Sequence, residues 1–469
     1  MRLFFLRVAL PIVLATTGLA VAGCVFFASI DQRAGVPTAL DFTDTSGTGR
    51  FEPINLGSGY VTQVKHPDRY LGYDYITSQI VPITEMGPTK ATALPEWPGR
   101  YVFQRLFSDD ATGEVRSEQR FVAVHPTAQL FDIRGAWVWL PQHAPLNVDA
   151  LSGLLDRLRQ DGFNWVQYNP WATFDGGKPT RAFLCDAQGQ LLSPGCFPYP
   201  TFSELRQATE LARAKGFHVA WHMSFGSFDP AGFAGRYELW SIDPPDLQSF
   251  FSSYADVIVS YAALAQESGV ELFSLSEFSA PLRAVARAPY EDLVRRVRSV
   301  YHGSLTAAEF TSPGMIPPEW EKEYPVTDLL DYVGMWWGFN AGQGGPPGPT
   351  GWTNGDCNPS VETMENNMFA ETSKYVVPYA KRYGKPIVVM TLPYLDHDCF
   401  NWKMSQDPGD YSTGRDEQEG VDVVEASLRV VSRQGMTGFF IGTYYLWEYE
   451  GDSWHGPLAD ALRIWFSPQ

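Results

Sequence analysis

Residues 261–277 read YAALAQESGVELFSLSE and show the unit from which most of this chain is built. They begin inside an amphipathic segment, 247–268, which predicts a helix, and Gly269 follows at a position where helices commonly end. An apolar run, 272–277, then predicts a short buried strand that ends in a carboxylate, Glu277. Alternation of helices with buried strands is typical of a parallel sheet covered by helices.

The same alternation continues from Pro126 to the C-terminus. The predicted strands are 135–140, 165–169, 218–223, 272–277, 305–310, 332–337, 386–392 and 438–446. The predicted helices are 148–160, 202–215, 247–268, 290–301, 361–382, 418–434 and 457–466. Glycines end five of the helices, at Gly162, Gly216, Gly269, Gly384 and Gly435. Over residues 131–469 this pattern predicts an α/β fold, a (β/α)8 TIM barrel with enlarged loops. A doubly wound open sheet is the alternative, although no glycine-rich phosphate fingerprint follows the first strand.

Residues before the barrel have a different pattern. Residues 51–126 consist of short β-prone runs separated by turn residues, and two of the runs, 99–107 and 118–124, suggest a hairpin. They predict a small all-β, sandwich-like domain that precedes the barrel. Residues 24–50 include a stretch rich in Thr, Ser, Gly and Asp and predict a tether.

The N-terminus predicts export. Two arginines, Arg2 and Arg7, precede an apolar run, 8–21, that is too short to span a bilayer comfortably. The run ends in Val21-Ala22-Gly23-Cys24, which resembles the lipobox of bacterial lipoproteins. The resemblance implies that residues 1–23 are a signal peptide and that Cys24 carries the lipid that attaches the protein to a bacterial membrane, facing the periplasm or the cell surface. An uncleaved signal anchor is the alternative, and both place the rest of the chain outside the cytoplasm.

Cysteine usage agrees with this compartment. Lipidation of one cysteine would leave four, an even number where disulfides are permitted. Cys185 and Cys196 flank a loop that contains Gly and Pro, which favours a local bridge, and Cys357 would then pair with Cys399. Four cysteines allow three pairings, and the sequence leaves the other two open. A zinc site of four thiolates is disfavoured because no Cys-x-x-Cys motif occurs.

Composition excludes several classes of protein. The chain has 35 Lys and Arg against 53 Asp and Glu, so its formal charge is 35 − 53 = −18. Nucleic acids need clustered cations, and we therefore expect no nucleic-acid partner. Hydrophobic residues make up 44% of the chain, which excludes a disordered polymer. Asp396-His397-Asp398 has the composition of a metal site, but neighbouring loop residues point in different directions, so we predict no metal and no cofactor.

The predicted strand ends carry an unusual set of side chains. In a (β/α)8 barrel the C-terminal ends of the strands form the active-site edge. Indole and phenol faces stack on the apolar faces of sugar rings, and amides bind hydroxyl groups. The candidate substrate-binding residues are Trp137, Trp139, Asn169, Trp171, His222, Trp336, Trp337, Tyr394, Tyr445 and Trp447. Core packing is the alternative role for any single tryptophan, so the prediction of a carbohydrate partner depends on their concentration at one edge.

Glu277 is the most informative residue, because a charge after an apolar strand costs burial energy unless it is paired or used. In this region the chain resembles the retaining (β/α)8 glycoside hydrolases, whose acid/base Glu ends the fourth strand, and more narrowly the endo-β-mannanase-type barrels and their unassigned relatives. The similar stretches are 261–273, Leu330-Asp331-Tyr332-Val333-Gly334 and Gly384-Lys385-Pro386-Ile387-Val388-Val389. The resemblance covers about residues 131–469 and implies that Glu277 is the general acid/base.

The chain departs from this family at the end of the seventh strand. The family places its nucleophile Glu there, and this chain has Thr391, which cannot act as an ionised nucleophile. Glu448, at the end of the eighth strand, is the first candidate for the second carboxylate. Asp396 or Asp398 acting on a water across a wider gap would imply inversion, and Glu309 is a third option.

Three functions remain open on this sequence. The first is an extracytoplasmic glycoside hydrolase that cleaves a polysaccharide or oligosaccharide by carboxylate acid/base catalysis. The second is a non-catalytic carbohydrate-binding lipoprotein on a degenerate hydrolase barrel, which the threonine at the nucleophile position favours. The third is a structural envelope lipoprotein whose barrel mediates only protein contacts.

Overall fold

The computed structural model describes the following parts of the chain: residues 30–41, 52–53, 61–67, 74–79, 83–85, 90–94, 97–109, 114–140, 145–174, 178–184, 200–227, 237–238, 243–275, 285–310, 326–337, 361–394, 417–443 and 457–468.

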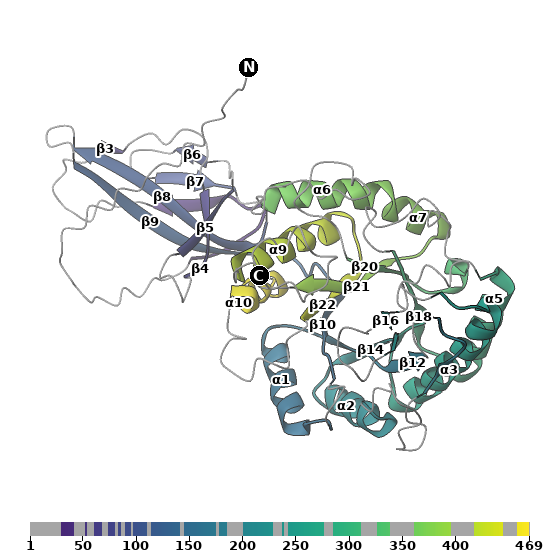
Figure 1. Ribbon diagram of the computed structural model, residues 1–469. Helices are drawn as coiled ribbons and strands as arrows, with labels where there is room; N and C mark the ends of the chain where they lie inside the picture. The colour runs from purple at the N-terminus through teal and green to yellow at the C-terminus, as the bar shows by residue number, and fades with distance from the viewer. Residues whose placement is uncertain are drawn as a thin grey trace.

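A parallel sheet closed into a barrel is the main feature of the fold (Figure 1). Its strands are β10 (Ile133–Trp137), β11 (Trp165–Tyr168), β14 (His218–His222), β17 (Leu272–Ser274), β18 (Ser304–Thr306), β19 (Ala308–Phe310), β20 (Val333–Trp336), β21 (Ile387–Tyr394) and β22 (Gly438–Thr443). Strand β10 pairs with β22, the last strand, as well as with β11. Strand β18 pairs with β17, and β19 pairs with β20. Because β18 and β19 are separated only by Ala307, they are two halves of one barrel strand, and the eight predicted strands are confirmed.

Helices alternate with these strands and cover the outside of the barrel. They are α1 (Val148–Gln160), α2 (Phe202–Ala214), α3 (Leu247–Ser268), α5 (Arg287–Val300), α6 (Val361–Lys374), α7 (Val376–Tyr383), α9 (Glu417–Arg433) and α10 (Pro457–Phe466). The predicted helix 361–382 is broken into α6 and α7 at Tyr375. Pro378 explains the break, since it has no N–H for the carbonyl one turn earlier and its ring clashes with that carbonyl.

Local sequence signals set where the helices begin. Asn147 caps α1, and its side chain accepts a hydrogen bond of 3.0 Å from the Ala150 N–H. Thr201 and Glu204 form a reciprocal capping box at the start of α2. The second oxygen of Glu204 accepts a hydrogen bond of 2.8 Å from the Leu146 N–H, so one carboxylate joins α2 to the segment before α1.

Glycines end the helices as predicted. All five have positive φ, with values of 91° at Gly162, 82° at Gly216, 75° at Gly269, 64° at Gly384 and 64° at Gly435. In this left-handed region a side chain would strain the backbone, and glycine is the residue that reverses the chain there at least cost. The glycines that mark the ends of the repeating units in the sequence therefore have the expected left-handed conformation.

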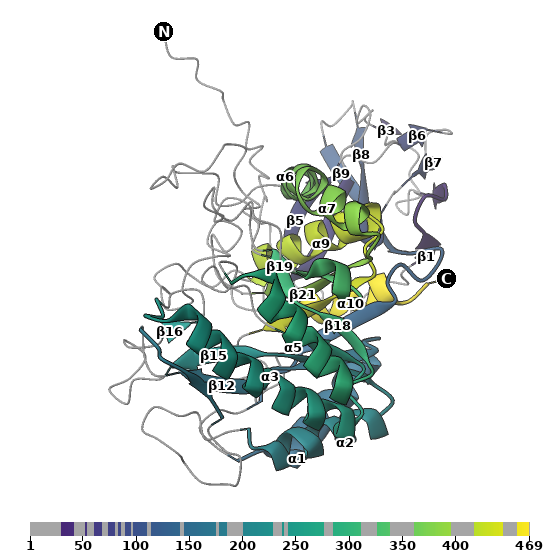
Figure 2. The same cartoon turned by 90° about the vertical axis from the view of Figure 1, so that its right-hand side faces the viewer.

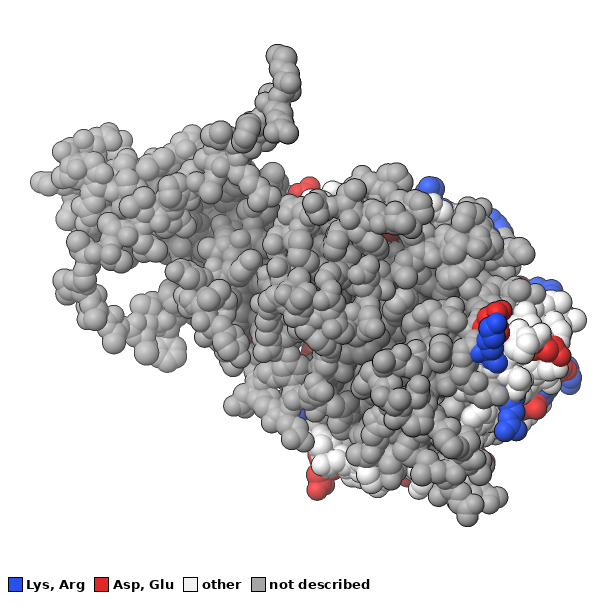
Figure 3. All heavy atoms as spheres, viewed as in Figure 1, with Lys and Arg blue, Asp and Glu red and all other residues white. Residues whose placement is uncertain are grey.

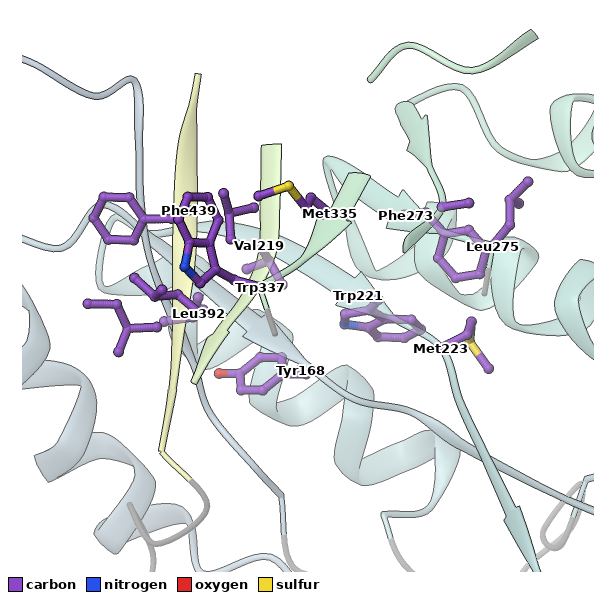
Figure 4. Packing of buried hydrophobic residues seen from close by; sticks show 14 of the residues in the cluster. Tyr168, Val219, Trp221, Met223, Phe273, Leu275, Met335, Trp337, Leu392 and Phe439 are labelled. Carbon is purple, nitrogen blue, oxygen red and sulfur yellow. The ribbon is translucent and has the colours of Figure 1, made fainter. Parts of the chain in front are cut away.

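Two apolar layers lie on the two faces of the barrel sheet. The outer layer packs between strands and helices, and Figure 4 shows part of it, including Tyr168, Trp221, Met335 and Trp337. The smaller inner layer fills the barrel and consists of Ile133, Ala220, Leu272, Val388, Met390 and Phe440, with Trp165 and Tyr332 against them. Successive strand residues alternate between these layers, which identifies the face of every strand side chain discussed below.

A second, smaller sheet extends the barrel beyond two of its strands. It contains β12 (Trp171–Phe174), β13 (Ala182–Phe183), β15 (Ser224–Ser227) and β16 (Tyr237–Glu238), and β12 pairs in parallel with β15. β12 follows β11 and β15 follows β14, so the sheet stands at the C-terminal ends of the barrel strands, opposite β1 and the C-terminus in Figure 2. The hydroxyl of Tyr261 on α3 donates a 2.5 Å hydrogen bond to the Trp171 carbonyl and holds β12 to the barrel.

Strands before the barrel form two sheets. They are β1 (Ile30–Arg33), β2 (Thr38–Asp41), β3 (Glu52–Pro53), β4 (Val61–Pro67), β5 (Asp74–Gln79), β6 (Ile83–Glu85), β7 (Lys90–Ala93), β8 (Gly99–Asp109) and β9 (Glu114–His125). The predicted hairpin is confirmed as β8 and β9, which pair over eleven registered positions from Gly99↔Val124 to Asp109↔Glu114. β1 and β2 lie inside residues 24–50, so part of the predicted tether is in strands. Packing of the two sheets into a sandwich stays a prediction.

The strands before the barrel contact its last helix. Trp97, just before β8, stacks on Trp465 of α10 with ring centroids 6.3 Å apart. The Arg429 guanidinium of α9 lies 5.7 Å from the centroid of the Trp97 ring. The His125 imidazole lies 3.1 Å from the carbonyl of Ser467. Trp97 and His125 therefore both connect the N-terminal strands to the C-terminal part of the barrel, and Trp97 contacts α9 and α10.

The described surface carries charges of both signs. On the face seen in Figure 3, acidic and basic side chains alternate near the edge that α3 and α5 occupy in Figure 1. The ion pairs there include Arg287–Asp328 at 2.7 Å and Arg296–Asp256 at 2.6 Å, with largely exposed partners. Within the described residues, none of the helices is both long enough and apolar enough to cross a membrane.

Candidate active site

Three tryptophans lie together at the C-terminal end of the barrel. Trp137 ends β10, and its ring stacks on that of Trp139 with centroids 5.2 Å apart. The Trp139 ring is 5.8 Å from that of Trp171, the first residue of β12. Trp137 and Trp171 are 7% and 6% exposed, whereas Trp139 is half-buried. Three residues predicted to bind substrate therefore form one continuous aromatic cluster.

A glycine on the neighbouring strand makes room for this cluster. Gly442 of β22 is paired in register with Trp137. A Cβ atom at position 442 would lie 2.2 Å from Cε3 of the Trp137 indole. Because such a contact is impossible without displacing the ring, glycine at this position is what allows Trp137 to occupy the inside of the barrel. The sequence reasoning missed Gly442.

Beside the tryptophans, polar side chains replace the apolar filling of the barrel. Gln167 lies two residues beyond Trp165 and His222 two residues beyond Ala220, so both face the inside, above the apolar layer. Gln167 is fully buried, and Asn169 and His222 are each 2% exposed. Ser274 and Thr306 continue the polar layer on the next strands, in register with His222 and with each other. The inside of the barrel therefore changes from apolar to polar toward its C-terminal end.

Only some of these polar groups are paired within the described residues. The Asn169 amide donates a hydrogen bond of 2.8 Å to the Ser224 hydroxyl. Its carbonyl oxygen Oδ1 has no hydrogen-bond partner among the described residues, and neither have Nδ1 of His222 or the two amide atoms of Gln167. Burial without a compensating charge lowers the pKa of His222 to about 3, so its imidazole is neutral. These side chains offer uncharged donors and acceptors, which suit hydroxyl groups.

The seventh-strand position is occupied by a threonine, which cannot act as an ionised nucleophile. Thr391 lies in β21, is 2% exposed and pairs in register with Trp336, the last residue of β20. Trp336 is half-buried, whereas its neighbour Trp337 is fully buried and packs in the outer layer between sheet and helices. Trp337 points away from the inside of the barrel, and we therefore remove it from the predicted sugar-binding residues. It takes the core-packing role that the sequence left open for any single tryptophan.

Several predicted residues lie outside the described parts of the chain. These are Glu277, Glu448, Tyr445, Trp447, Asp396, Asp398 and the five cysteines, Cys24, Cys185, Cys196, Cys357 and Cys399. The backbone of Tyr394 belongs to β21 and that of Glu309 to β19, but the side chains of both are not among the parts that the structure describes. The roles predicted for all of these residues stay predictions.

The described residues contain no group of three or more His, Cys, Asp or Glu side chains that could hold a metal ion.

Of the residues that the sequence reasoning missed, Ser274 and Thr306 had a detectable signal, since each alternates with apolar residues that face the helices. Gly442 had none, because its role depends on the neighbouring strand.

Comparisons with known proteins identify the fold. No protein-family profile matches the sequence. No curated protein matches it either. Among solved structures, a GH113 β-1,4-mannanase complex has a TM-score of 0.53 at 14% identity, with 73% of this chain and 100% of that chain covered. The GH113 β-mannanase of Alicyclobacillus acidocaldarius has a TM-score of 0.53 at 16% identity, covering 72% of this chain and 97% of its own. At these identities the likeness concerns the fold, and the chain shares the barrel fold of these mannanases.

Proposed function

We propose that the protein is an extracytoplasmic glycoside hydrolase that cleaves a polysaccharide or oligosaccharide, with Glu277 as general acid/base and Glu448 as the second carboxylate. The observation that carries the proposal is the cluster of Trp137, Trp139 and Trp171 beside buried amides at the C-terminal end of the barrel. Flat aromatic faces next to uncharged hydrogen-bonding groups match a sugar ring, which has apolar faces and a polar edge. The fold shared with GH113 mannanases supports the same reading.

The chemistry requires two carboxyl groups. One must be protonated to assist departure of the glycosidic oxygen, and the other must be ionised to attack the anomeric carbon or to activate water. Because Glu277 follows β17 by three residues in the sequence, we expect it at the C-terminal end of the barrel, where the tryptophans lie. Glu448 follows β22 by five residues in the sequence, and we expect it at the same end. Asp396, Asp398 and Glu309 are the alternatives for the second role.

A matched pair of variants tests the hydrolase. Glu277→Gln should reduce the release of reducing sugar from a panel of polysaccharides by at least about a thousandfold, because the amide cannot donate the proton. Glu271→Gln is the control, since Glu271 lies just before the N-terminal end of β17, where its carboxylate is 2.8 Å from Nδ1 of His218. Equal activity of the Glu277→Gln variant and the wild type would remove Glu277 from the mechanism.

A non-catalytic carbohydrate-binding protein is the second candidate, favoured by Thr391 at the position where a nucleophile is expected. It predicts that the wild type binds oligosaccharides without releasing product from any of them. Binding that is equal in the wild type and in the Glu277→Gln variant, with no hydrolysis by either, would establish this function and exclude the first.

Membrane attachment through Cys24 is part of the proposal. In cells supplied with radiolabelled palmitate, the wild type should be labelled and recovered with membranes, and Cys24→Ser should lose the label. Label in the Cys24→Ser variant would exclude lipidation at this residue. The pairs Cys185–Cys196 and Cys357–Cys399 are proposed as disulfides, and non-reducing peptide mapping of the secreted protein tests them.

A further inference from the structure

Unsatisfied polar atoms inside the barrel gather in one place. Gln167 and Asn169 belong to β11 and its end, and His222 ends β14, the strand next to it. The ladder between the two strands pairs Tyr168 with Trp221, so the following residues, Asn169 and His222, lie side by side. Both amide atoms of Gln167, Oδ1 of Asn169 and Nδ1 of His222 have no hydrogen-bond partner among the described residues. We name these three side chains the amide–imidazole layer.

Such a layer is unfavourable for the empty protein. A buried amide that makes no hydrogen bond has lost its water contacts without replacement, and native proteins leave few such groups unexplained. One isolated group is tolerated, but here three neighbouring residues are affected on two adjacent strands. They adjoin the tryptophan cluster, because Gln167 is paired in register with Trp137. The arrangement is that of a binding site whose hydrogen bonds are completed by a bound ligand.

The chemistry of the layer limits which ligands can bind there. Amides present donors and acceptors without charge, and burial keeps the His222 imidazole neutral by lowering its pKa. A carboxylate or phosphate group brought here would lose its hydration without gaining a cationic partner from these three side chains. The formal charge of −18 for the whole chain also repels polyanions at a distance. A hydroxyl group meets neither obstacle.

We propose that the amide–imidazole layer is a subsite for the hydroxyl groups of an uncharged sugar unit, and that Gln167 is its specificity-determining residue. The inference rests on the proposed carbohydrate function and deepens it, since it selects neutral glycans over uronic-acid polymers. The Gln167 amide has a hydrogen-bond donor and an acceptor side by side, which suits two vicinal hydroxyl groups of a sugar. Contact with the tryptophan cluster and edge contacts with Gln167 then orient the same sugar unit.

The experiment uses Gln167→Met, which keeps the length of the side chain and removes its hydrogen-bonding groups. Binding of mannohexaose, cellohexaose and xylohexaose is measured by the change in tryptophan fluorescence, with hexagalacturonate as the acidic probe of equal length. Thermal unfolding of each variant is recorded in parallel. Gln248→Met is the matched control, because Gln248 is exposed on the first turn of α3.

At least one neutral hexaose should bind, and hexagalacturonate should bind at least tenfold more weakly. Gln167→Met should lose at least tenfold in affinity for the neutral ligand while its Tm is unchanged or higher, since methionine removes an unsatisfied amide from the core. A purely structural glutamine would instead lower the Tm and leave affinity unchanged. The Gln248→Met variant should match the wild type in both measurements.

The outcomes separate this inference from the proposed hydrolase. Neutral hexaoses that bind through Gln167 without being cleaved would support the subsite and overturn the hydrolase. Cleavage of hexagalacturonate in preference to neutral hexaoses would support the hydrolase and overturn the subsite. Unchanged affinity in the Gln167→Met variant would also overturn the subsite, and failure of every sugar to bind would overturn both.

Discussion

At the scale of single residues, His222 shows how the inside of the barrel controls charge. Its imidazole is 2% exposed at the end of β14, and burial lowers its pKa from an ordinary value of 6.5 to about 3. An imidazole with this pKa stays neutral through the physiological range and cannot act as a general acid there. It can still donate or accept one hydrogen bond through Nδ1, which is the role a sugar-binding site requires.

The depressed pKa of His222 predicts a loss of stability in acid. Below pH 6.5 the unfolded chain binds a proton at this residue and the folded chain does not, so stability falls from pH 6.5 toward pH 3. The loss between pH 7 and pH 5 should be about 2 kcal/mol from this residue. Replacing His222 by Gln should remove that part of the pH dependence in urea unfolding experiments, whereas the same change at the exposed His302 should not. An identical pH dependence in the wild type and the His222→Gln variant would contradict the neutral imidazole.

Individual side chains also show where sequence reasoning stops. Trp137, Trp139 and Trp171 were predicted to lie together because strand ends in a barrel converge, and their ring distances agree. Trp337 was assigned to the same edge, but its side chain packs between the sheet and the helices. A shift of one residue along a strand moves a side chain to the opposite face of the sheet. Periodicity predicts that a strand alternates, but it does not tell which set of alternate residues faces inward when both sets are apolar or aromatic.

At the scale of elements, the capping box of α2 acts beyond its own helix. One oxygen of Glu204 accepts the Thr201 N–H at 2.8 Å, and the other accepts the Leu146 N–H at 2.8 Å, before α1. The two helices flank the strand that carries Gln167, so this carboxylate fixes the relative position of the elements around the site. Sequence reasoning predicted both helices within a few residues, because each has a cap and an apolar face. It could not predict the bond that joins them.

Loss of the Glu204 carboxylate should destabilise the protein. Glu204→Ala removes two bonds from Thr201 and one bond from Leu146, and we expect a decrease of about 1 to 2 kcal/mol in the free energy of unfolding. Urea denaturation followed by tryptophan fluorescence measures it. Glu210→Ala is the control, since Glu210 is exposed on the same helix and should change stability little. A Glu204→Ala variant as stable as this control would show that the three bonds make no net contribution to stability.

At the scale of the whole molecule, the Trp97 side chain links the N-terminal strands to the barrel. The Trp97 ring contacts both the Arg429 guanidinium and the Trp465 ring. Arg429 is itself 1% exposed and pairs at 3.5 Å with Glu365 of α6. The sequence predicts a boundary between the β strands and the barrel at about residue 126, because the hydrophobic period changes there, and this boundary stays a prediction. Contacts between the two parts involve residues more than 300 positions apart and leave no local pattern.

Removal of the Trp97 ring should weaken this attachment. Trp97→Ala leaves a cavity between two buried aromatic and cationic partners, and we expect a loss of about 2 kcal/mol in the free energy of unfolding. Limited proteolysis should then cleave the N-terminal strands faster, while the barrel core resists. Tyr375→Ala, at a side chain that is 40% exposed, is the control. Equal protease resistance of Trp97→Ala and the wild type would indicate that other contacts hold the two parts together.

The pairing of β10 with β22 and the packing of Trp97 on α10 have a consequence for biosynthesis. A ribosome makes the N-terminal strands first, but the helix on which they pack, α10, is made only after all the barrel strands. The first barrel strand likewise waits for the last strand before its second edge is paired. Until then it presents unpaired backbone groups to other chains. Removing α10 should therefore affect the packing of the N-terminal strands as well as the barrel, and a nascent chain has an unpaired edge on β10 until β22 has been made.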